Sequence, residues 1–221
     1  GLVDAHTHLT ESFAKSLAFH EPAQLWRRLW FPLEMALTPE AAGVAARLAC
    51  WEALRGGFAT VVDAGCKNPD LTEVVIEAAD EVGIRAVLAV EVADRRPPDA
   101  PPDAPPARTC EDAISLIERH LARLSGRPRI TPSIALSVGW ASDTLLREAV
   151  ALARGGRAIV QVHAAQHTRE VEQTVETTGS RPIEYLAKAG LLGPSTVVAH
   201  GVLTTMAEVR LLAATGAGVV Y

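Results

Sequence analysis

The chain has 221 residues, of which 48% are hydrophobic, and a formal net charge of −5 at pH 7. This length and composition predict one globular unit over residues 1–221, either an ordinary domain or one large barrel. The acidic balance and the lack of a basic tract argue against a nucleic-acid partner, and no apolar run reaches the roughly 18 residues that a membrane span needs. The three scattered cysteines lack Cys-x-x-Cys spacing, which favours a reducing, cytoplasmic compartment over a disulfide framework.

The first predicted element is a strand over residues 1–9, which begins apolar and ends with His6 and His8. Because side chains alternate between the two faces of a strand, these histidines point the same way, about 6.6 Å apart. Two imidazoles at this spacing can bind one divalent ion, with nitrogen–metal distances of about 2.0–2.1 Å. A pair of surface or hydrogen-bonded histidines is the alternative that this motif alone leaves open.

Helices and strands then alternate along the chain. Capping residues and glycines mark the helix ends, and short β-branched runs indicate buried strands. The predicted helices span residues 23–30, 38–55, 71–82, 110–125, 142–154, 168–176, 182–189 and 204–215, and the later predicted strands span residues 59–65, 84–92, 129–138, 157–163, 196–200 and 218–221. The segment 94–107 carries six prolines and is predicted to be a stiff loop, either a surface insertion or a lid over a site.

Strands that alternate with helices are typical of parallel βα units. The seven strand signals predict an α/β fold, a (β/α)8 TIM-like barrel truncated after about seven strands. A doubly wound open sheet is the competing fold, but no strand is followed by Gly-x-Gly-x-x-Gly. Because the chain has no initiator methionine and both ends lie in strand-like segments, we expect it to be cut from a longer protein.

Histidines mark the ends of three predicted strands. In a barrel, functional residues gather at the C-terminal ends of the strands. The four histidines at such ends are His6, His8, His163 and His200. Four imidazoles at one rim suit zinc or ferrous iron, and a catalytic site would usually add a carboxylate and a water.

Several motifs resemble those of the amidohydrolase superfamily. The opening stretch from Gly1 to Leu9 is similar to the first barrel strand of that superfamily. Further stretches resemble its branch of triazine chlorohydrolases, guanine deaminase and S-adenosylhomocysteine deaminase; they cover residues 30–34, 37–40, 53–63, 162–172 and 191–201. The resemblance runs over essentially the whole chain.

This resemblance implies that His6, His8, His163 and His200 hold one divalent metal ion, zinc or alternatively Fe(II). It also implies an aspartate after an eighth strand and a small flanking β-sandwich, both outside this sequence, and possible assembly into homo-oligomers. The fourth predicted strand ends in Ser137 and Trp140 with no lysine or histidine, so we expect one metal ion rather than two.

Gln166 departs from the pattern of the deaminases in this branch. They usually carry a glutamate three residues after the fifth-strand histidine, where it shuttles a proton. An amide has no titratable proton near neutrality, so Gln166 can hydrogen-bond to a substrate but cannot be a general acid or base. Either the absent aspartate carries all the proton transfers, or His167 takes the role of the glutamate, although adjacent residues at a strand end point apart.

The predicted function is metal-dependent hydrolysis of a carbon–nitrogen bond in a small nitrogen heterocycle, of deaminase or cyclic-amide type, by metal-activated water. His200 and Gln166 are the predicted catalytic residues, and Gln166, His167, Trp140 and Asp63 are the predicted substrate-binding residues. Asp63 has an alternative role as a loop anchor, and Trp140 as a packing residue. The rival functions are an imidazolonepropionase-like ring-opening hydrolase, a metal-binding scaffold that has lost catalysis, and a plain α/β domain whose histidines satisfy core hydrogen bonds.

Overall fold

The structure is a computed structural model that describes residues 1–17, 25–96, 100, 104 and 106–221. The described chain divides into two compact units. The first unit is formed chiefly by residues 1–91, and the second chiefly by residues 106–125 and 132–221. Both are built from parallel strands joined by helices, as the α/β prediction requires.

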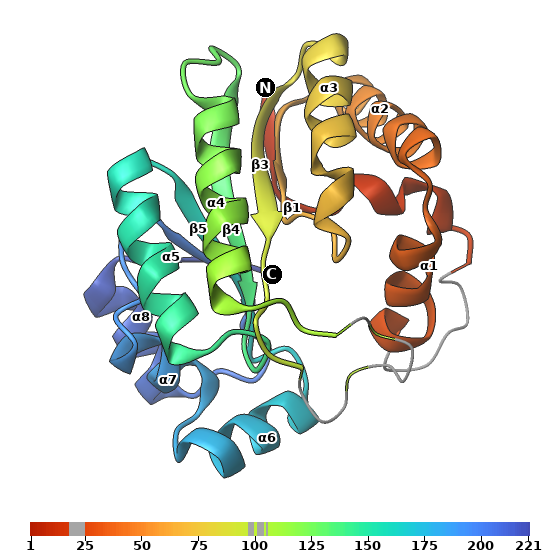
Figure 1. The fold of residues 1–221 in the computed structure, drawn as a ribbon. Helices are drawn as coiled ribbons and strands as arrows, with labels where there is room; N and C mark the ends of the chain where they lie inside the picture. The colour runs from red at the N-terminus through yellow and green to blue at the C-terminus, as the bar shows by residue number, and fades with distance from the viewer. Residues whose placement is uncertain (18–24, 97–99, 101–103, 105) are drawn as a thin grey trace. The chain divides into compact units, whose positions relative to one another are not determined.

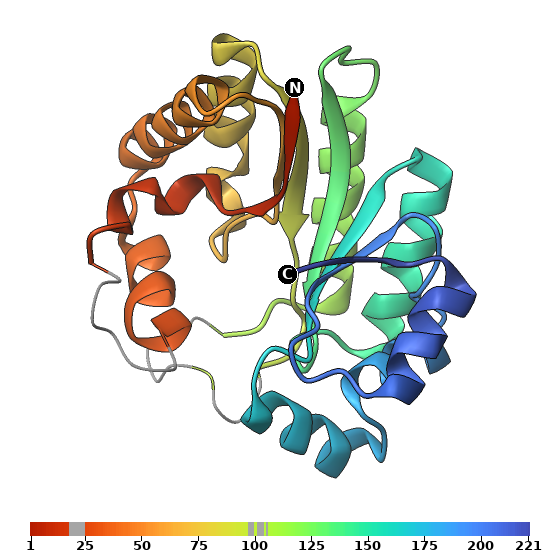
Figure 2. The same cartoon turned by 180° about the vertical axis from the view of Figure 1, so that it is seen from behind.

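The first unit contains three parallel strands in sequential order. The strands are β1 (Leu2–Thr7), β2 (Phe58–Asp63) and β3 (Arg85–Glu91). The short helices of this unit are η1 (Leu9–Ala14), η2 (Trp26–Trp30), α1 (Phe31–Ala36) and η3 (Pro69–Leu71). Its longer helices are α2 (Pro39–Arg55) and α3 (Thr72–Val82). Helices α2 and α3 pack side by side, and η1 runs from the end of β1 alongside α2 (Figures 1 and 2). The Ser12 hydroxyl links η1 to α2 by donating a hydrogen bond to the Ala45 carbonyl oxygen at 2.8 Å.

Local sequence signals explain the ends of the two longer helices. The Thr38 hydroxyl accepts from the Ala41 N–H at 3.2 Å, and Pro39 occupies the first turn of α2, where its missing N–H costs no hydrogen bond. Helix α3 ends at Gly83, which adopts the left-handed conformation with φ 81°. Each of these ends agrees with the sequence prediction.

The second unit contains four parallel strands, again in sequential order. Its elements are α4 (Cys110–Leu124), β4 (Ile130–Ser137), α5 (Asp143–Gly156), β5 (Ile159–Ala164), α6 (Thr168–Thr178), α7 (Pro182–Lys188), β6 (Thr196–His200), α8 (Met206–Thr215) and β7 (Gly218–Val220). Helix α4 packs beside α5, and α7 beside α8 (Figure 1). In both units each strand pairs with the next one along the chain, which favours a barrel over a doubly wound sheet, whose strand order reverses.

Several helical segments differ from the prediction, among them η1, which lies where the sequence predicts the end of a strand and a loop. The sequence predicts a short helix over residues 23–30, of which 23 and 24 lie outside the described residues; η2 and α1 extend the helical structure to Ala36. Pro32 does not end this helix, because it lies in the first turn of α1. Glycines 155 and 156 do not end α5 either; the helix continues to Gly156, and Arg157 adopts the left-handed cap with φ 53°.

Half of the proline-rich loop predicted over residues 94–107 lies outside the described residues, namely 97–99, 101–103 and 105. At its described start, the Asp94 carboxylate accepts from the Ser142 N–H at 2.7 Å and from the Ser142 hydroxyl at 2.5 Å. The loop therefore leaves from a point anchored to the cap of α5. Within the described ranges, no helix is long and apolar enough to cross a membrane.

A buried ion pair joins α7 to α8. Glu208 is 0% exposed and accepts from the Arg181 Nε at 2.9 Å and from the Thr205 N–H at 2.8 Å. Arg181 also donates to the Leu203 carbonyl at 2.5 Å. Burial works against ionisation of Glu208, but the hydrogen bonds from Thr205 and Arg181 outweigh it and lower the pKa of this carboxyl.

We predict that Glu208→Ala lowers the free energy of unfolding by about 2–4 kcal/mol, because Arg181 loses its buried partner. Since the folded pKa of Glu208 is lowered, the stability from its ionised form is present above the unfolded pKa of about 4.3 and is lost as the pH falls through the folded value. Urea unfolding of the full-length protein at several pH values measures both effects. Glu176→Ala, at an exposed position of α6, is the control and should move neither quantity.

Candidate active site

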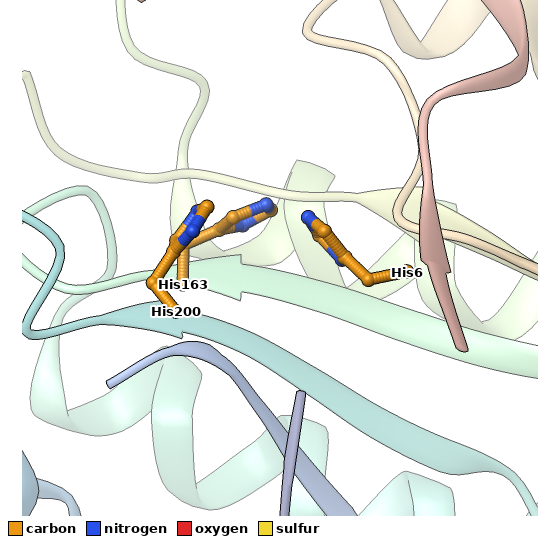
Figure 3. Close-up of side chains that lie close together, drawn as sticks. All are labelled: His6, His163 and His200. Carbon is orange, nitrogen blue, oxygen red and sulfur yellow. The ribbon is translucent and has the colours of Figure 1, made fainter. Parts of the chain in front are cut away.

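The second unit places two of the predicted ligands on neighbouring strands. His163 pairs with Ala199 across the ladder of β5 and β6, and Ala164 pairs with His200. The two imidazole rings lie 5.4 Å apart between centroids and are inclined by 35°. Figure 3 shows both rings as sticks, together with His6 of β1. The C-terminal ends of β5 and β6 thus present two nitrogen donors side by side, as the sequence predicts.

The turn that leaves β5 carries the predicted Gln166 and His167. Ala165 is buried and adopts a left-handed conformation with φ 55°, while Gln166 and His167 are exposed. The Glu170 carboxylate accepts from the Ala165 N–H at 2.7 Å and from the Gln166 N–H at 2.8 Å. Burial raises the pKa of Glu170, while these hydrogen bonds act against that rise. The backbone around Gln166 is therefore held from within α6.

His167 has a structural task in this turn. Its Nδ1 accepts from the Glu170 N–H at 3.1 Å, which makes His167 the N-cap of α6. A ring that accepts at Nδ1 carries its proton on Nε2 when it is neutral. The side chain therefore serves the helix end, and its predicted contact with a substrate stays a prediction.

The first unit places the other predicted pair at the end of β1. The rings of His6 and His8 are 5.3 Å apart between centroids and nearly perpendicular, at 87°. His8 Nδ1 lies 2.9 Å from the Gly65 carbonyl oxygen. Because a carbonyl can only accept, Nδ1 carries a proton, and in the neutral ring the lone pair is on Nε2. Metal-binding histidines are usually oriented in this way.

Asp63 anchors the backbone on both sides of this contact. It is 3% exposed, and its two carboxylate oxygens accept from the Leu9 N–H at 2.8 Å and from the Gly65 N–H at 3.1 Å. Gly65 has φ 82°, and a Cβ there would lie 3.1 Å from the Ala89 carbonyl oxygen, so the position requires glycine. These bonds are those of the loop anchor that the sequence analysis names as the alternative role of Asp63. A contact of Asp63 with a substrate stays a prediction.

Two carboxylates that the sequence analysis does not select lie beside His8. One ligand atom from each of His8, Glu11 and Glu34 lies within 4.8 Å of the others. Glu34 is 2% exposed and accepts from the Thr10 hydroxyl at 3.2 Å and from the Lys67 N–H at 3.1 Å. Glu34 lies in the stretch 30–34 that carries the family resemblance, and Glu11 follows His8 by three residues, so both signals are visible in the sequence.

Burial dominates the electrostatics of this group. It raises the pKa of Glu11 to about 7 and of Asp63 to about 6, and it raises the pKa of Glu34 as well. Burial of the His8 ring acts to lower its pKa, but the carboxylates around it, Glu11 foremost, outweigh burial and raise it. The acids and the imidazole thus compensate one another's charge in a region with little solvent.

Trp140 lies in the turn after β4 and is half-buried. Its backbone carbonyl accepts from the N–H groups of Asp94 and Arg95 at 3.1 and 3.0 Å, and its own N–H donates to the Ser137 carbonyl at 3.1 Å. These bonds give the Trp140 backbone a structural role. Stacking of the indole on a planar substrate stays a prediction.

Comparisons with known proteins identify the relatives of this chain. The model of the amidohydrolase family matches residues 1–220. The 5-methylthioadenosine/S-adenosylhomocysteine deaminase of Halobacterium salinarum is 34% identical over 225 residues, which cover 100% of this chain and 49% of that protein. The 5'-deoxyadenosine deaminase of Methanopyrus kandleri is 31% identical, over 98% of this chain and 48% of that protein. The chain thus spans about half the length of the curated relatives it matches.

Solved structures share the fold at lower identity. The guanine deaminase of C. acetobutylicum, with bound guanine, has a TM-score of 0.87 at 19% identity. The match covers 99% of this chain and 53% of the guanine deaminase chain. An adenosine deaminase from Xanthomonas campestris with bound zinc has a TM-score of 0.85 at 24% identity. The match covers 100% of this chain and 48% of the adenosine deaminase chain. The fold is accordingly a TIM-like α/β barrel, as predicted. The chain belongs to the amidohydrolase family.

We predict that Asp63→Asn weakens metal binding of the full-length protein about 10- to 100-fold. The amide can accept through only one oxygen, so either the Leu9 or the Gly65 N–H loses its acceptor and His8 loses its fixed orientation. Zinc titration with a competing chelator measures the change. Asp70→Asn, at an exposed position of the same unit, is the matched control; equal affinities in the two variants would contradict the anchoring role.

Proposed function

We propose that the chain is the barrel portion of a metal-dependent hydrolase that cleaves a carbon–nitrogen bond of a small nitrogen heterocycle, of deaminase or cyclic-amide type. The observation that carries the proposal is the placement of histidine pairs at strand ends, at the end of β1 and on β5 and β6. Membership of the amidohydrolase family supports it, as do relatives named deaminases that are at least 31% identical.

The proposed metal ligands are His6, His8, His163 and His200, which would together hold one divalent ion. Neutral imidazoles suit zinc, and zinc is bound in the Xanthomonas campestris neighbour. Fe(II) is the second candidate. The fit rests on the donor chemistry: in each unit two rings lie within 5.4 Å of each other, and His8 donates from Nδ1 to a carbonyl, as metal-binding histidines do.

The proposed catalytic roles follow from what each side chain can donate or accept. When bound, a divalent ion supplies Lewis-acid activation of water and of the scissile group. His200, beside His163, polarises the group that departs or the carbonyl that forms. Gln166 hydrogen-bonds to the substrate and orients it, but its amide can neither take nor give a proton. The proton transfers therefore require a titratable group other than Gln166.

Gln166 also favours a second candidate function. Ring-opening hydrolysis without ammonia release would suit an amide there if a group other than residue 166 protonates the ring nitrogen. A barrel that binds metal without catalysis would suit it too. Ammonia release distinguishes the deaminase type from both possibilities, because ring opening releases no ammonia and a barrel without catalysis forms no product.

The setting of this activity is also proposed. A net charge of −5 and three scattered cysteines support a cytoplasmic enzyme with a small-molecule substrate and without a nucleic-acid partner. Assembly into a homo-oligomer stays a prediction.

We predict about one zinc or iron ion per chain in the full-length protein and its loss in His163→Ala, because one of the four proposed ligands is removed. Elemental analysis of the purified protein measures the content, and ammonia release from amino-substituted heterocycles measures the activity. His167→Ala is the histidine control and should keep its metal, since His167 Nδ1 serves as a helix cap. An absence of metal in the wild-type protein would overturn the proposal.

We predict that Gln166→Glu raises ammonia release at least about 10-fold on substrates whose departing amine must be protonated, because general acid–base catalysis contributes about 100- to 10,000-fold. Steady-state kinetics against pH measure this gain. The matched control is Gln173→Glu on α6, which introduces the same charge outside the exit turn of β5. Equal rates in Gln166→Glu and the wild-type protein would show that residue 166 does not face the leaving group.

A further inference from the structure

Glu170 makes contacts that exceed those of an ordinary helix cap. It is the third residue of α6, and in a capping box a glutamate at this position returns to the N–H of the N-cap residue. The N-cap here is His167, but the Glu170 carboxylate reaches past it. One oxygen accepts from the Ala165 N–H at 2.7 Å and the other from the Gln166 N–H at 2.8 Å. Both oxygens therefore hold the exit turn of β5 rather than the first turn of α6.

The conformation of this turn explains why such a clamp is needed. Ala165 has φ 55°, a left-handed backbone that residues with a side chain seldom adopt. Its side chain is 0% exposed, so the strained residue is enclosed by the protein. Two hydrogen bonds to one ionised carboxylate are stronger than neutral ones and select this conformation over the extended one. The direction in which Gln166 leaves the strand follows from it.

The same turn also supports the end of β6. The Ala164 carbonyl accepts from the Gly201 N–H at 3.0 Å, and the Ala165 carbonyl accepts from the Leu203 N–H at 3.0 Å. His200, which precedes Gly201, is itself left-handed with φ 79°. The exit turns of β5 and β6 are thus bonded into one network, and Glu170 enters it from α6.

We infer that Glu170 is a positioning residue, whose carboxylate clamps the Ala165 and Gln166 amides so that Gln166 is presented to the substrate beside His163. This inference rests on the proposed function for its catalytic consequence, but the clamp itself does not. Glu170 touches no substrate in this scheme; it acts through the backbone of Gln166. A second role, as a simple stabiliser of α6, makes different predictions for the same variants.

Three variants of the full-length, metal-loaded protein separate the two roles. Glu170→Gln keeps the length of the side chain but offers one acceptor oxygen to two N–H donors, and Glu170→Ala offers none. Glu172→Gln, at an exposed position of the same helix, is the control for loss of one negative charge. Amide hydrogen exchange at Ala165 and Gln166 is measured for each, with thermal unfolding as a check of folding.

If the clamp exists, exchange at Ala165 and Gln166 becomes at least about 10-fold faster in Glu170→Ala than in Glu172→Gln, with Glu170→Gln between them. Unchanged exchange in Glu170→Ala would overturn the clamp. This measurement needs no substrate, so it stands even if the wild-type protein fails to hydrolyse any heterocycle, a result that would instead contradict the proposed function.

The catalytic part is tested by a double-mutant cycle with Gln166→Ala. If Glu170 acts through Gln166, Glu170→Ala lowers kcat about 100-fold in the wild-type background, the loss expected from a misplacement of about 1 Å. In the Gln166→Ala background the same change has little further effect on kcat. Equal losses in both backgrounds would show that Glu170 merely stabilises the helix and would overturn the positioning role.

Discussion

Parallel strand pairing is the constraint on which the site depends. Parallel strands end at a common edge, so a histidine at the end of one strand meets a histidine at the end of the next without any long loop to guide it. The register that pairs His163 with Ala199 and Ala164 with His200 offsets the two imidazoles by one residue and leaves their rings 5.4 Å apart. The contacts of the Ala165 turn and of Glu170 act on side chains that this register has already brought together.

Buried charge is the second constraint, and it acts in the first unit. Desolvation alone would drive Glu11 and Asp63 towards their neutral forms, and it raises the pKa values of both. Asp63 resists this by accepting two backbone N–H bonds, whereas Glu11 has the His8 ring as its main compensating charge. The His8 ring and the carboxylates around it therefore stabilise one another's charged forms.

Much of the fold and part of the site could be predicted from the sequence. Strands and capped helices follow from local periodicity, and the strand-end histidines from their position in it. Glu11 and Glu34 stand beside signals that the sequence shows, but their meeting beside His8 depends on the fold, since Glu34 is brought to Lys67 across 33 positions of sequence. Glu170 contacts residues only four and five positions before it, and its role follows from the left-handed turn at Ala165, which the sequence pattern does not predict. The end of α5 was missed for another reason, since Arg157 adopts the left-handed cap that two preceding glycines would have been expected to supply.

The left-handed turns after β5 and β6 extend the rigid backbone beyond the ends of these strands. In barrels of this kind the segments beyond the strand ends are usually free to vary, and new specificities arise there. In this chain the backbone from Ala164 to Gln166 and from His200 to Leu203 is bonded together, and His200 owes its direction to a backbone angle outside the strand region. These residues therefore belong to the rigid frame. A substitution that changes the backbone of one turn therefore has to be accommodated by the other, whereas an exposed side chain such as that of Gln166 can change while the frame stays in place.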